Sequence, residues 1–460
     1  MHDHTDQPHA TTLRFLGAAN TVTGSRYLLQ TPQRRILIDC GLFQGYKFLR
    51  ERNWKPFPVD PESIDAIVLT HAHLDHSGYV PALIAQGFSG KVYCSAGTAA
   101  LCEILWPDAG HLQEEEAEFQ NRHQISKHHP ALPLYDEDQA RKALHFLYVV
   151  DTHKPLRIGD IEILLQPNGH ILGSCALSVN AAGKTLFFSG DVGRPHDALM
   201  HAPQPPLPAD YLIIESTYGN RQHENIDVET KFADLINTTA RKGGAILVPA
   251  FAVGRAQLVM YLLHRLRSSR RIPNLPVYLD SPMAISVTDL LHRFRDQHRL
   301  TDDECAQMCR AVHYTRTADE SRALNQLTMP RIIISASGMA TGGRVLHHLK
   351  YLLGDDRNVI LFAGYQSGGT RGARLVSGET QIKIHGRYYE VHARIENLDM
   401  LSAHADCDEL VQWLRHLPSA PKQAFVTHGE PEAADAMRVR LQNEFNWQVC
   451  APDQGDIFTL

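Results

Sequence analysis

The sequence predicts an α/β protein built from two domains, the second inserted into the first. The chain has 460 residues, which exceeds the size at which one hydrophobic core stops growing. Short apolar runs typical of buried strands occur in both the first and the last parts of the chain. Between them, from about residue 225 to 385, strand-like runs alternate with helix-like stretches, which is typical of a parallel sheet covered by helices.

Six strand-like runs in the outer parts of the chain lead into a side chain that can bind a metal ion. They are Arg35–Ile38 before Asp39, Ala66–Thr70 before His71, Ile161–Leu165 before His170, Thr185–Gly190 before Asp191, Tyr211–Ile214 before Glu215, and Gln423–Thr427 before His428. Sites in sheet enzymes form at strand ends, because loops converge there. We therefore expect these side chains to meet at one site.

The inserted segment shows the other pattern. Residues 228–242 and 256–268 are helix-like, and the strand-like runs are 245–249, 276–280, 331–335 and 359–363. Such alternation predicts a separate α/β domain. Candidate metal ligands resume only after this segment, at His404 and His428.

Composition narrows the class of protein. The longest apolar run, residues 245–253, is far shorter than the about 20 residues that span a bilayer, so we expect no membrane partner. The eight cysteines are scattered without a C-x-x-C pair, which favours reduced thiols in a cytoplasmic protein. Residues 1–10 are polar and are expected to form a disordered tail. With a net charge of −6, a nucleic-acid site must be a local basic surface.

The densest motif is His71-Ala-His73-Leu-Asp75-His76, directly after a strand-like run. Imidazole and carboxylate groups suit zinc, and the absence of a thiol favours a catalytic site over a structural one. One loop cannot easily wrap four side chains around a single ion. A split of the ligands between two adjacent ions is therefore more natural.

This pattern, H-x-H-x-D-H, resembles the signature of the metallo-β-lactamase superfamily. Asp39, His170 in Gly169–Ser174 and Asp191 in Ser189–Asp191 resemble its other motifs, in the same order. The resemblance implies a four-layer αββα sandwich. It also implies two zinc ions, one bound by His71, His73, His170 and Asp191, and the other by Asp75, His76, His428 and again Asp191. Asp39 would lie behind these ligands and orient a histidine or the metal-bound water.

Three later motifs resemble those of the β-CASP nucleases. They are Glu215 in Glu215–Gly219, His404 in Ser402–Asp406, and His428 in Thr427–Glu430. The pattern is similar to that of the nuclease subunit of the eukaryotic cleavage and polyadenylation machinery and its bacterial and archaeal relatives. The resemblance assigns residues 11–209 and 390–460 to the metallo-β-lactamase domain and 210–389 to an inserted α/β β-CASP domain. DNA-directed members usually carry valine in place of His428, so the resemblance favours RNA.

These motifs predict a metal-dependent hydrolase that cleaves RNA phosphodiester bonds with a water activated by two zinc ions, for which manganese is the alternative. We expect an endonuclease, with 5′-exonuclease action left open. His404 is the candidate general acid, and Glu215 would orient it and raise its pKa. The residues assigned to catalysis are Asp39, Asp75, Glu215 and His404.

The inserted domain is expected to bind the RNA. The glycine-rich stretch Ser335–Arg344 follows a strand-like run, and its small residues would let backbone amides approach a phosphate. The candidate substrate-binding residues are Arg255, Ser337, Gly338, Thr341, Gly342, Arg344 and Gln366. Single-stranded RNA is the expected partner, and a homodimer stays open.

Two rival functions are also consistent with parts of the sequence. A small-molecule ester or thioester hydrolase would use the zinc ligands, but it would need neither the inserted domain nor Glu215 and His404. A non-catalytic scaffold of an RNA-processing complex would lack metal ligands, whereas every expected ligand position is filled here.

Overall fold

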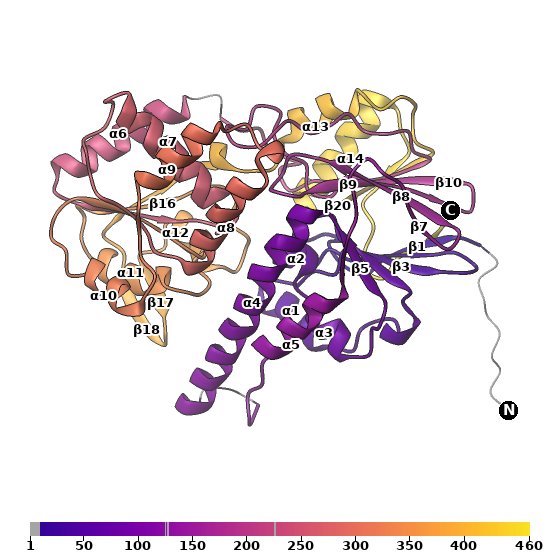
Figure 1. The fold of residues 1–460 in the computed structure, drawn as a ribbon, viewed down its shortest axis with the longest axis horizontal. Helices are drawn as coiled ribbons and strands as arrows, with labels where there is room; N and C mark the ends of the chain where they lie inside the picture. The colour runs from indigo at the N-terminus through magenta and orange to yellow at the C-terminus, as the bar shows by residue number, and fades with distance from the viewer. Residues whose placement is uncertain (1–9, 125, 127, 225–226) are drawn as a thin grey trace. The chain divides into compact units, whose positions relative to one another are not determined.

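The computed structural model describes residues 10–124, 126, 128–224 and 227–460. The expected tail therefore lies, apart from residue 10, outside the described residues. The chain forms two compact units (Figure 1): the first comprises Met1–His196, Ala202–Gln222 and His404–Leu460, and the second Asp197–His201 and His223–Ala403. In the part of the chain that the structure describes, no helix has the length and apolar character needed to cross a bilayer.

Two seven-stranded sheets form the centre of the first unit within the described residues. In spatial order, the first sheet contains β22 (Ile457–Thr459), β1 (Thr12–Phe15), β2 (Tyr27–Gln30), β3 (Arg35–Ile38), β4 (Ala66–Val68), β5 (Lys91–Cys94) and β6 (Leu147–Val149). The second contains β21 (Val449–Cys450), β20 (Gln423–Thr427), β11 (Tyr211–Glu215), β10 (Lys184–Phe188), β9 (Cys175–Ala181), β8 (Ile161–Pro167) and β7 (Leu156–Ile158).

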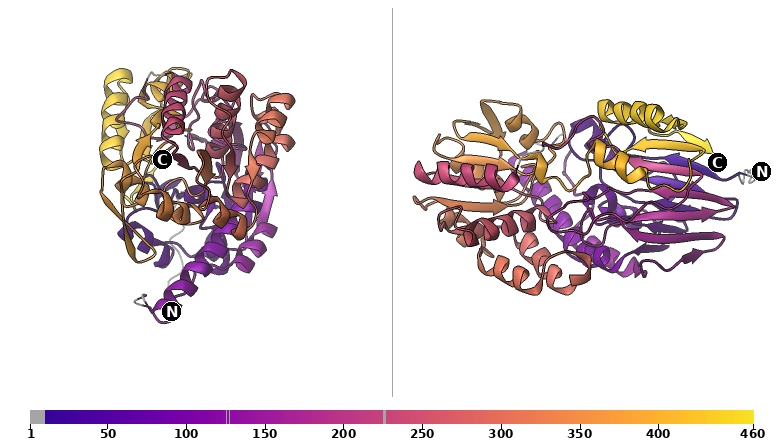
Figure 2. Two further views of the ribbon diagram at one scale, coloured as in Figure 1. Left: turned by 90° about the vertical axis from the view of Figure 1, so that its left-hand side faces the viewer. Right: turned by 90° about the horizontal axis from the view of Figure 1, so that it is seen from above.

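The inner faces of these two sheets pack against each other. One buried cluster joins Phe15 and Ile38 of the first sheet to Leu177, Phe188 and Phe425 of the second. The outer face of the second sheet is covered by α13 (Cys407–Leu414) and α14 (Pro431–Phe445), the yellow helices of Figure 2. The helices α1 (Lys47–Arg50), α2 (Leu74–Ser77), α3 (Val80–Ala85), α4 (Ala96–His123) and α5 (Glu137–Ala143) follow strands of the first sheet.

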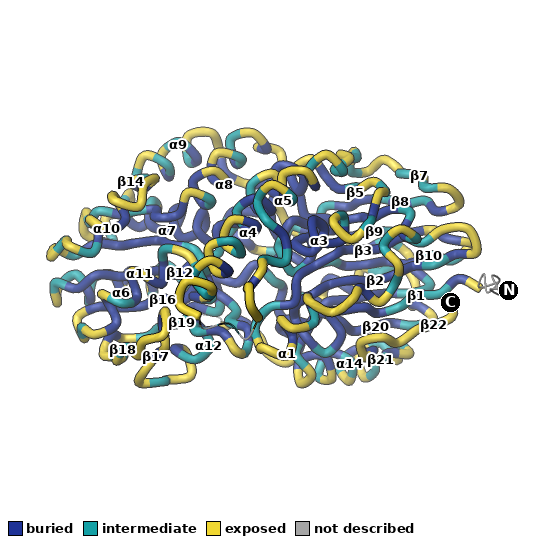
Figure 3. Tube along the Cα trace, turned by 90° about the horizontal axis from the view of Figure 1, so that it is seen from below, coloured by how far each residue is buried: buried dark blue, intermediate teal, exposed yellow. Residues whose placement is uncertain are grey.

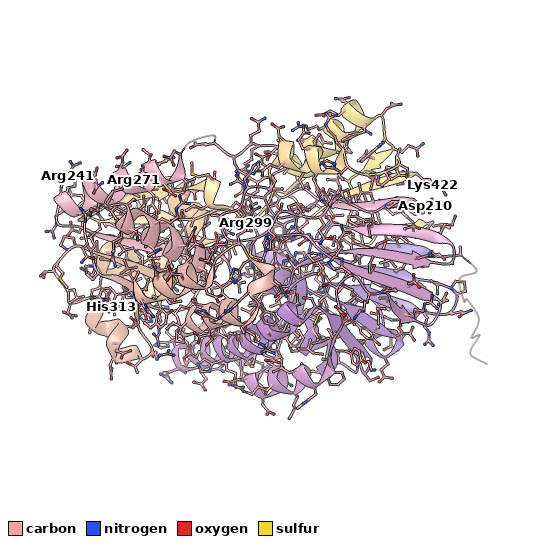
Figure 4. All side chains as sticks on the ribbon, turned by 45° about the horizontal axis from the view of Figure 1, so that its top comes forward. Asp210, Arg241, Arg271, Arg299, His313 and Lys422 are labelled. Atoms are coloured by element: carbon pink, nitrogen blue, oxygen red, sulfur yellow. The ribbon has the colours of Figure 1, made fainter. Side chains whose placement is uncertain are left out.

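The central strands of the second sheet join distant parts of the sequence. β11 pairs in parallel with β10 on one side and with β20 on the other, although more than 200 residues separate β11 from β20. At the start of these two strands, Asp210 Oδ1 lies 2.9 Å from Lys422 Nζ (Figure 4). The pairing brings Glu215 and His428, at the ends of the two strands, to the same edge of the sheet.

A parallel sheet forms the core of the second unit. Its six strands, among the described residues, run in the order β14 (His313–Tyr314), β13 (Val277–Leu279), β15 (Arg331–Ser335), β12 (Ala245–Pro249), β16 (Val359–Phe362) and β19 (Arg394–Asn397). β17 (Gln381–Ile384) and β18 (Arg387–Glu390) form a hairpin. The helices are α6 (Val228–Arg241), α7 (Arg255–Ser268), α8 (Pro282–Arg293), α9 (Asp302–Arg310), α10 (Ala318–Leu324), α11 (Val345–Leu352) and α12 (Arg371–Val376).

Helices cover both faces of this sheet. Along β12, Ile246 and Val248 belong to the buried cluster that contains α6 and α7, whereas Ala245 and Leu247 belong to the cluster that contains α11. This alternation is what a strand buried on both faces requires. It explains why these strands are continuously apolar in the sequence.

Apart from Asp197–His201, which belongs to the second unit, the compact units divide the chain later than the predicted domain boundaries at residues 210 and 389. β11 pairs with β10 and β20 and therefore belongs to the first unit. β19 pairs with β16 and therefore belongs to the second. The unit limits lie at Gln222 and Ala403, and the predicted domain division remains a proposal about this chain.

Candidate metal centre

His71 and His73 lie in the loop between β4 and α2, and His76 lies within α2. The strand pairing carries the backbone to the sheet edge, and α2 then turns the chain so that the backbone amides of His76 and Ser77 donate to the carbonyl of His73 at 2.9 Å. The segment after β3 lies directly against this loop, because Cys40 donates its amide to the carbonyl of His76 at 2.7 Å. A Cβ atom at Gly41 would lie 1.6 Å from the carbonyl oxygen of Asp75, so this approach requires glycine.

Four potential ligand atoms of this unit converge on one point: His71 Nε2, His73 Nδ1, His170 Nε2 and Asp191 Oδ2. The His73 nitrogen lies 3.2 Å from each of the other two imidazole nitrogens. Asp191 Oδ2 lies 3.4 Å from the His71 nitrogen and 3.5 Å from that of His170. Ligand atoms about 2.0–2.2 Å from a tetrahedral zinc lie roughly 3.3–3.6 Å from one another, so the spacing fits a metal shell.

A second group adjoins the first and contains Asp75, His76 and His428. His76 Nε2 lies 2.9 Å from His428 Nε2, which lies 3.7 Å from Asp75 Oδ2. The other oxygen of Asp191, Oδ1, lies 3.2 Å from His76 Nε2. Asp191 therefore presents one oxygen to each group, as a bridging carboxylate would.

Burial keeps the first group of imidazoles neutral. It lowers the pKa of His71 to about 3 and that of His73 to about 4, and it also lowers the pKa of His170. A neutral imidazole has the free electron pair that a metal ligand needs. Burial raises the pKa of Asp191, but His428 and His76 outweigh this effect and hold the carboxyl ionised. The three histidines and the aspartate of the first group are thus in the protonation states that bind a divalent cation.

Two contacts hold the second group from behind. Asp39 Oδ2 lies 2.7 Å from His76 Nδ1, while the Asp39 carboxylate also accepts hydrogen bonds from the amide and hydroxyl of Thr70, at 2.7 and 2.8 Å. Burial lowers the pKa of His76, but the charges of Asp191 and Asp39 outweigh it and raise that pKa. The Thr217 hydroxyl lies 3.1 Å from His428 Nδ1. These partners fix the ring orientations, as such supporting hydrogen bonds do in metal sites.

His404 and Glu215 form a pair beside the first group. His404 Nδ1 lies 3.1 and 3.3 Å from the two carboxylate oxygens of Glu215, and the His404 ring centroid lies 4.5 Å from that of His170. Val192 donates its amide to Glu215, and Ala405 donates its amide to the carbonyl of Val192 at 2.8 Å. Burial lowers the pKa of His404, but the charges of Glu215 and Asp191 outweigh it and raise the pKa above the ordinary value.

The candidate substrate-binding residues lie in the second unit, and several are bonded within it. Arg344 donates to Asp280 Oδ1 at 2.7 Å and to two backbone carbonyls. Buried Arg255 donates to the carbonyl of Leu401, and Gln366 Nε2 donates to that of Gly338 at 3.2 Å. The Ser337 hydroxyl accepts from the amides of Thr341 and Gly342 at 3.0 and 3.4 Å. Their contact with substrate stays a prediction, and the arginines serve the fold of this unit.

Sequence reasoning missed Thr70, Thr217 and Asp280. Thr70 and Thr217 lie beside motif residues, but a hydroxyl in a strand-like or turn sequence gives no separate signal. Asp280 follows a strand-like run in the same way as Asp39, and this placement was the available signal.

Comparison with known proteins agrees with this geometry. Residues 20–216 match the profile described as the metallo-beta-lactamase superfamily, residues 256–375 the Beta-Casp domain, and residues 388–452 the Zn-dependent metallo-hydrolase RNA specificity domain. The chain is 36% identical over 426 residues to Ribonuclease TTHA0252 of Thermus thermophilus, covering 90% of this chain and 92% of that protein. The chain belongs to the β-CASP family of the metallo-β-lactamase superfamily.

Two further proteins are similar to this chain, one in sequence and one in fold. The chain is 31% identical over 447 residues to the transcription termination factor FttA of Methanothermobacter thermautotrophicus, covering 91% of this chain and 67% of that protein. A crystal structure of a protein of unknown function from Enterococcus faecalis V583 covers 98% of this chain and 100% of that one, with a TM-score of 0.54 and 14% identity, and it shows the fold alone. The predicted family, the predicted fold class and the predicted enzyme class, a metal-dependent hydrolase, are confirmed.

Proposed function

We propose that this β-CASP protein hydrolyses phosphodiester bonds of single-stranded RNA in the cytoplasm, as an endonuclease with two zinc ions per chain. The observation that carries the proposal is the pair of ligand groups that share Asp191, with the His404–Glu215 pair beside them. The names of its relatives, a ribonuclease and an RNase J-like protein, support RNA as the substrate class. Manganese is the alternative ion.

The proposed site residues divide into ligands and proton-handling groups. His71, His73 and His170 would bind one ion, Asp75, His76 and His428 the other, and Asp191 both. Two adjacent ions, when bound, lower the pKa of a water and draw charge from the phosphate oxygens. Asp39 fixes the ring of His76 through the 2.7 Å contact at Nδ1 and thereby turns Nε2 toward the ligand group.

His404 is the proposed acid. Glu215 accepts the Nδ1 proton of His404, so the Nε2 proton is the one available to the leaving oxygen. The charges of Glu215 and Asp191 raise the pKa of His404 and thereby favour the protonated ring that an acid needs. The products would carry a 5′-phosphate and a 3′-hydroxyl.

Replacement of His404 tests the proposed acid. We expect His404→Ala to lower kcat for RNA cleavage by about 10²–10⁴-fold while the zinc content is unchanged, because the residue handles a proton and binds no metal. The measurement is digestion of end-labelled RNA carrying a 5′-phosphate or a 5′-triphosphate, with zinc determined by mass spectrometry. The exposed His145 provides the matched control, His145→Ala, which should cleave at the wild-type rate.

Two results would contradict the proposal. Normal cleavage by His404→Ala would remove the acid. A zinc-loaded wild-type protein that leaves RNA intact but opens a thioester would favour the small-molecule hydrolase instead.

A further inference from the structure

The first unit exposes three aromatic side chains in one short segment after β3. This segment, residues 43–57, contains α1 and a 3-10 turn at Glu51–Trp54. Tyr46 is 44% exposed, Phe48 58% and Trp54 59%. Figure 3 shows most of α1 as exposed. Single exposed apolar side chains are common on protein surfaces, whereas several large aromatic side chains exposed together are typical of a binding site.

The same segment is fixed firmly from its buried side. Phe43 donates its amide to Asn53 Oδ1 at 2.9 Å and accepts from Asn53 Nδ2 at 2.8 Å, so one amide side chain closes the loop. The buried Arg26 guanidinium donates to the carbonyl of Gly41 at 2.8 Å and lies 4.9 Å from the ring centroid of Phe43 and 5.5 Å from that of Phe57. The exposed rings are thus presented by an anchored loop.

The exposed rings lie among cations. Residues 46–55 contain four basic side chains, Lys47, Arg50, Arg52 and Lys55, and a single acid, Glu51, in a chain whose net charge is −6. Arg52 lies 5.8 Å from the ring centroid of Phe48, and the rings of Tyr46 and Phe48 are nearly parallel with centroids 5.7 Å apart. A basic segment on an acidic protein is complementary to a polyanion.

The segment also begins close to the metal centre. Leu42 donates its amide to the carbonyl of Leu74 at 2.8 Å, at the start of α2 and directly after His73. Tyr46 follows Leu42 by four residues, so extended chain between them can span at most about 14 Å. The aromatic rings therefore begin within reach of a strand of RNA whose scissile phosphate lies at the metal centre.

We propose that Tyr46, Phe48 and Trp54 form a stacking platform that binds bases of single-stranded RNA, while Lys47, Arg50, Arg52 and Lys55 bind its phosphates. Aromatic rings combined with a basic surface are the means by which proteins bind single strands without sequence preference, because every base has a stacking face. The inference rests on the proposed ribonuclease activity, since RNA bound here is the substrate of the adjacent site.

The first test separates substrate binding from catalysis. For a 20-nucleotide RNA, we expect Phe48→Ala/Trp54→Ala to raise KM at least about tenfold while kcat stays within about threefold of wild type. Hydrolysis of bis(p-nitrophenyl) phosphate, which has no bases to stack, should be unchanged. The matched control is Tyr148→Ala, which removes another exposed aromatic ring of this unit that lies 4.2 Å from a lysine nitrogen, Lys91 Nζ.

The outcomes of this test distinguish the two proposals. An inactive wild-type protein toward RNA would overturn the proposed function. Cleavage by the double variant with wild-type KM would overturn the platform alone, and so would an equal KM increase in Tyr148→Ala. Trp54→Phe, which keeps an aromatic ring, should retain the wild-type KM.

A second test observes stacking directly. Trp54 is exposed, whereas Trp106 and Trp413 are buried and Trp447 is half-buried, so base stacking should quench chiefly Trp54 fluorescence. We expect dodecaadenylate to quench the zinc-loaded His404→Ala protein, and to leave His404→Ala/Trp54→Phe unquenched. Tripolyphosphate, which carries charge without bases, should not quench. Equal quenching by tripolyphosphate, or no quenching by dodecaadenylate, would overturn stacking.

A change of oligomeric state in Phe48→Ala/Trp54→Ala with unchanged RNA binding would overturn the platform and would instead identify an interface between copies of the chain.

Discussion

Each unit of the protein has a buried carboxylate in contact with histidine, three rings at Asp191 and one at Asp280, and the two clusters differ in kind. In the first unit, Asp191 lies 3.2–3.5 Å from the nitrogens of His71, His76 and His170. In the second unit, Asp280 lies 2.6 Å from His348 Nε2, 2.5 Å from the Ser321 hydroxyl and 2.7 Å from Arg344 NH1. Both carboxylates are almost fully buried.

The two clusters differ in whether hydrogen-bond donors fill the contacts around the carboxylate. Ser321 and Arg344 donate hydrogen bonds to Asp280, and His348 Nε2, 2.6 Å from Asp280 Oδ2, donates to it in the tautomer that carries the proton on that nitrogen. The imidazoles of His71, His73 and His170 are neutral, and His73 Nδ1 lies 3.2 Å from a nitrogen of each of the other two without enough protons to bridge them all. Donors at hydrogen-bond distance complete the Asp280 cluster, whereas the wider Asp191 cluster fits a cation at its centre. Residue composition alone does not separate the two.

Replacing the shared carboxylate should have the largest effect. We expect Asp191→Asn to lower RNA cleavage by at least about a thousandfold, since the residue presents one oxygen to each ligand group and two-metal stabilisation amounts to several kcal/mol. The zinc content should fall below that of wild type, and the melting temperature of the metal-free protein should not fall. The measurements are cleavage rate, bound zinc and calorimetry. Full zinc content in an active Asp191→Asn protein would refute the shared-ligand assignment.

Replacing Asp280 should have the opposite pattern. We expect Asp280→Asn to lower the free energy of unfolding by about 3 kcal/mol, because it breaks a buried ion pair and leaves Arg344 without its carboxylate. Zinc content and the cleavage rate of folded protein should stay within a few-fold of wild type. The control is Asp319→Asn, which removes an exposed pair with Arg322 and should cost less than about 1 kcal/mol. Urea unfolding measures both, and a loss of zinc from Asp280→Asn would show that the second cluster also serves the metal centre.

The contrast between the two clusters explains why the sequence predicts one of them and not the other. His71, His73 and His76 lie within six residues after a strand-like run, so their pattern is local. Ser321, Arg344 and His348 come from α10, α11 and the residue before it, and no spacing in the sequence connects them with Asp280. For this reason the sequence does not indicate the contact of Arg344 with Asp280, and substrate binding by Arg344 stays a prediction.

Exposure was hidden from the sequence for a similar reason. In residues 43–57, Phe43 and Phe57 are buried while Phe48 and Trp54 are exposed, and neither a helical nor a strand period separates them.

The domain limits also depend on long-range pairing. The sequence does not indicate that β11 belongs to the first unit, because its partner strand β20 comes about 200 residues later.

Lowering the pH should reduce the stability of the metal-free protein through the two clusters over different pH ranges. This effect should be smaller than those of the two substitutions. Burial holds the pKa of His71 at about 3, below its unfolded value, so the unfolded chain binds a proton that the folded chain does not. Stability from this neutral imidazole is present above about pH 6.5 and falls on acidification by about 1.4 kcal/mol per pH unit. Asp280 behaves differently: burial raises its pKa, but His348, Ser321 and Arg344 lower it more, so its contribution is lost only below about pH 4.

Urea unfolding of the metal-free protein between pH 7 and pH 5, compared between wild type and a ligand variant, therefore tests the contribution of the neutral ligand. We expect His71→Gln to show a shallower loss of stability than wild type over this range, by up to one proton, and Asp280→Asn to show the wild-type slope from a lower starting stability. Identical slopes for wild type and His71→Gln would mean that the folded protein protonates this imidazole before a metal binds. In that case the spacing around Asp191 would reflect charged hydrogen bonds of the Asp280 kind, and the contrast between the two clusters would disappear.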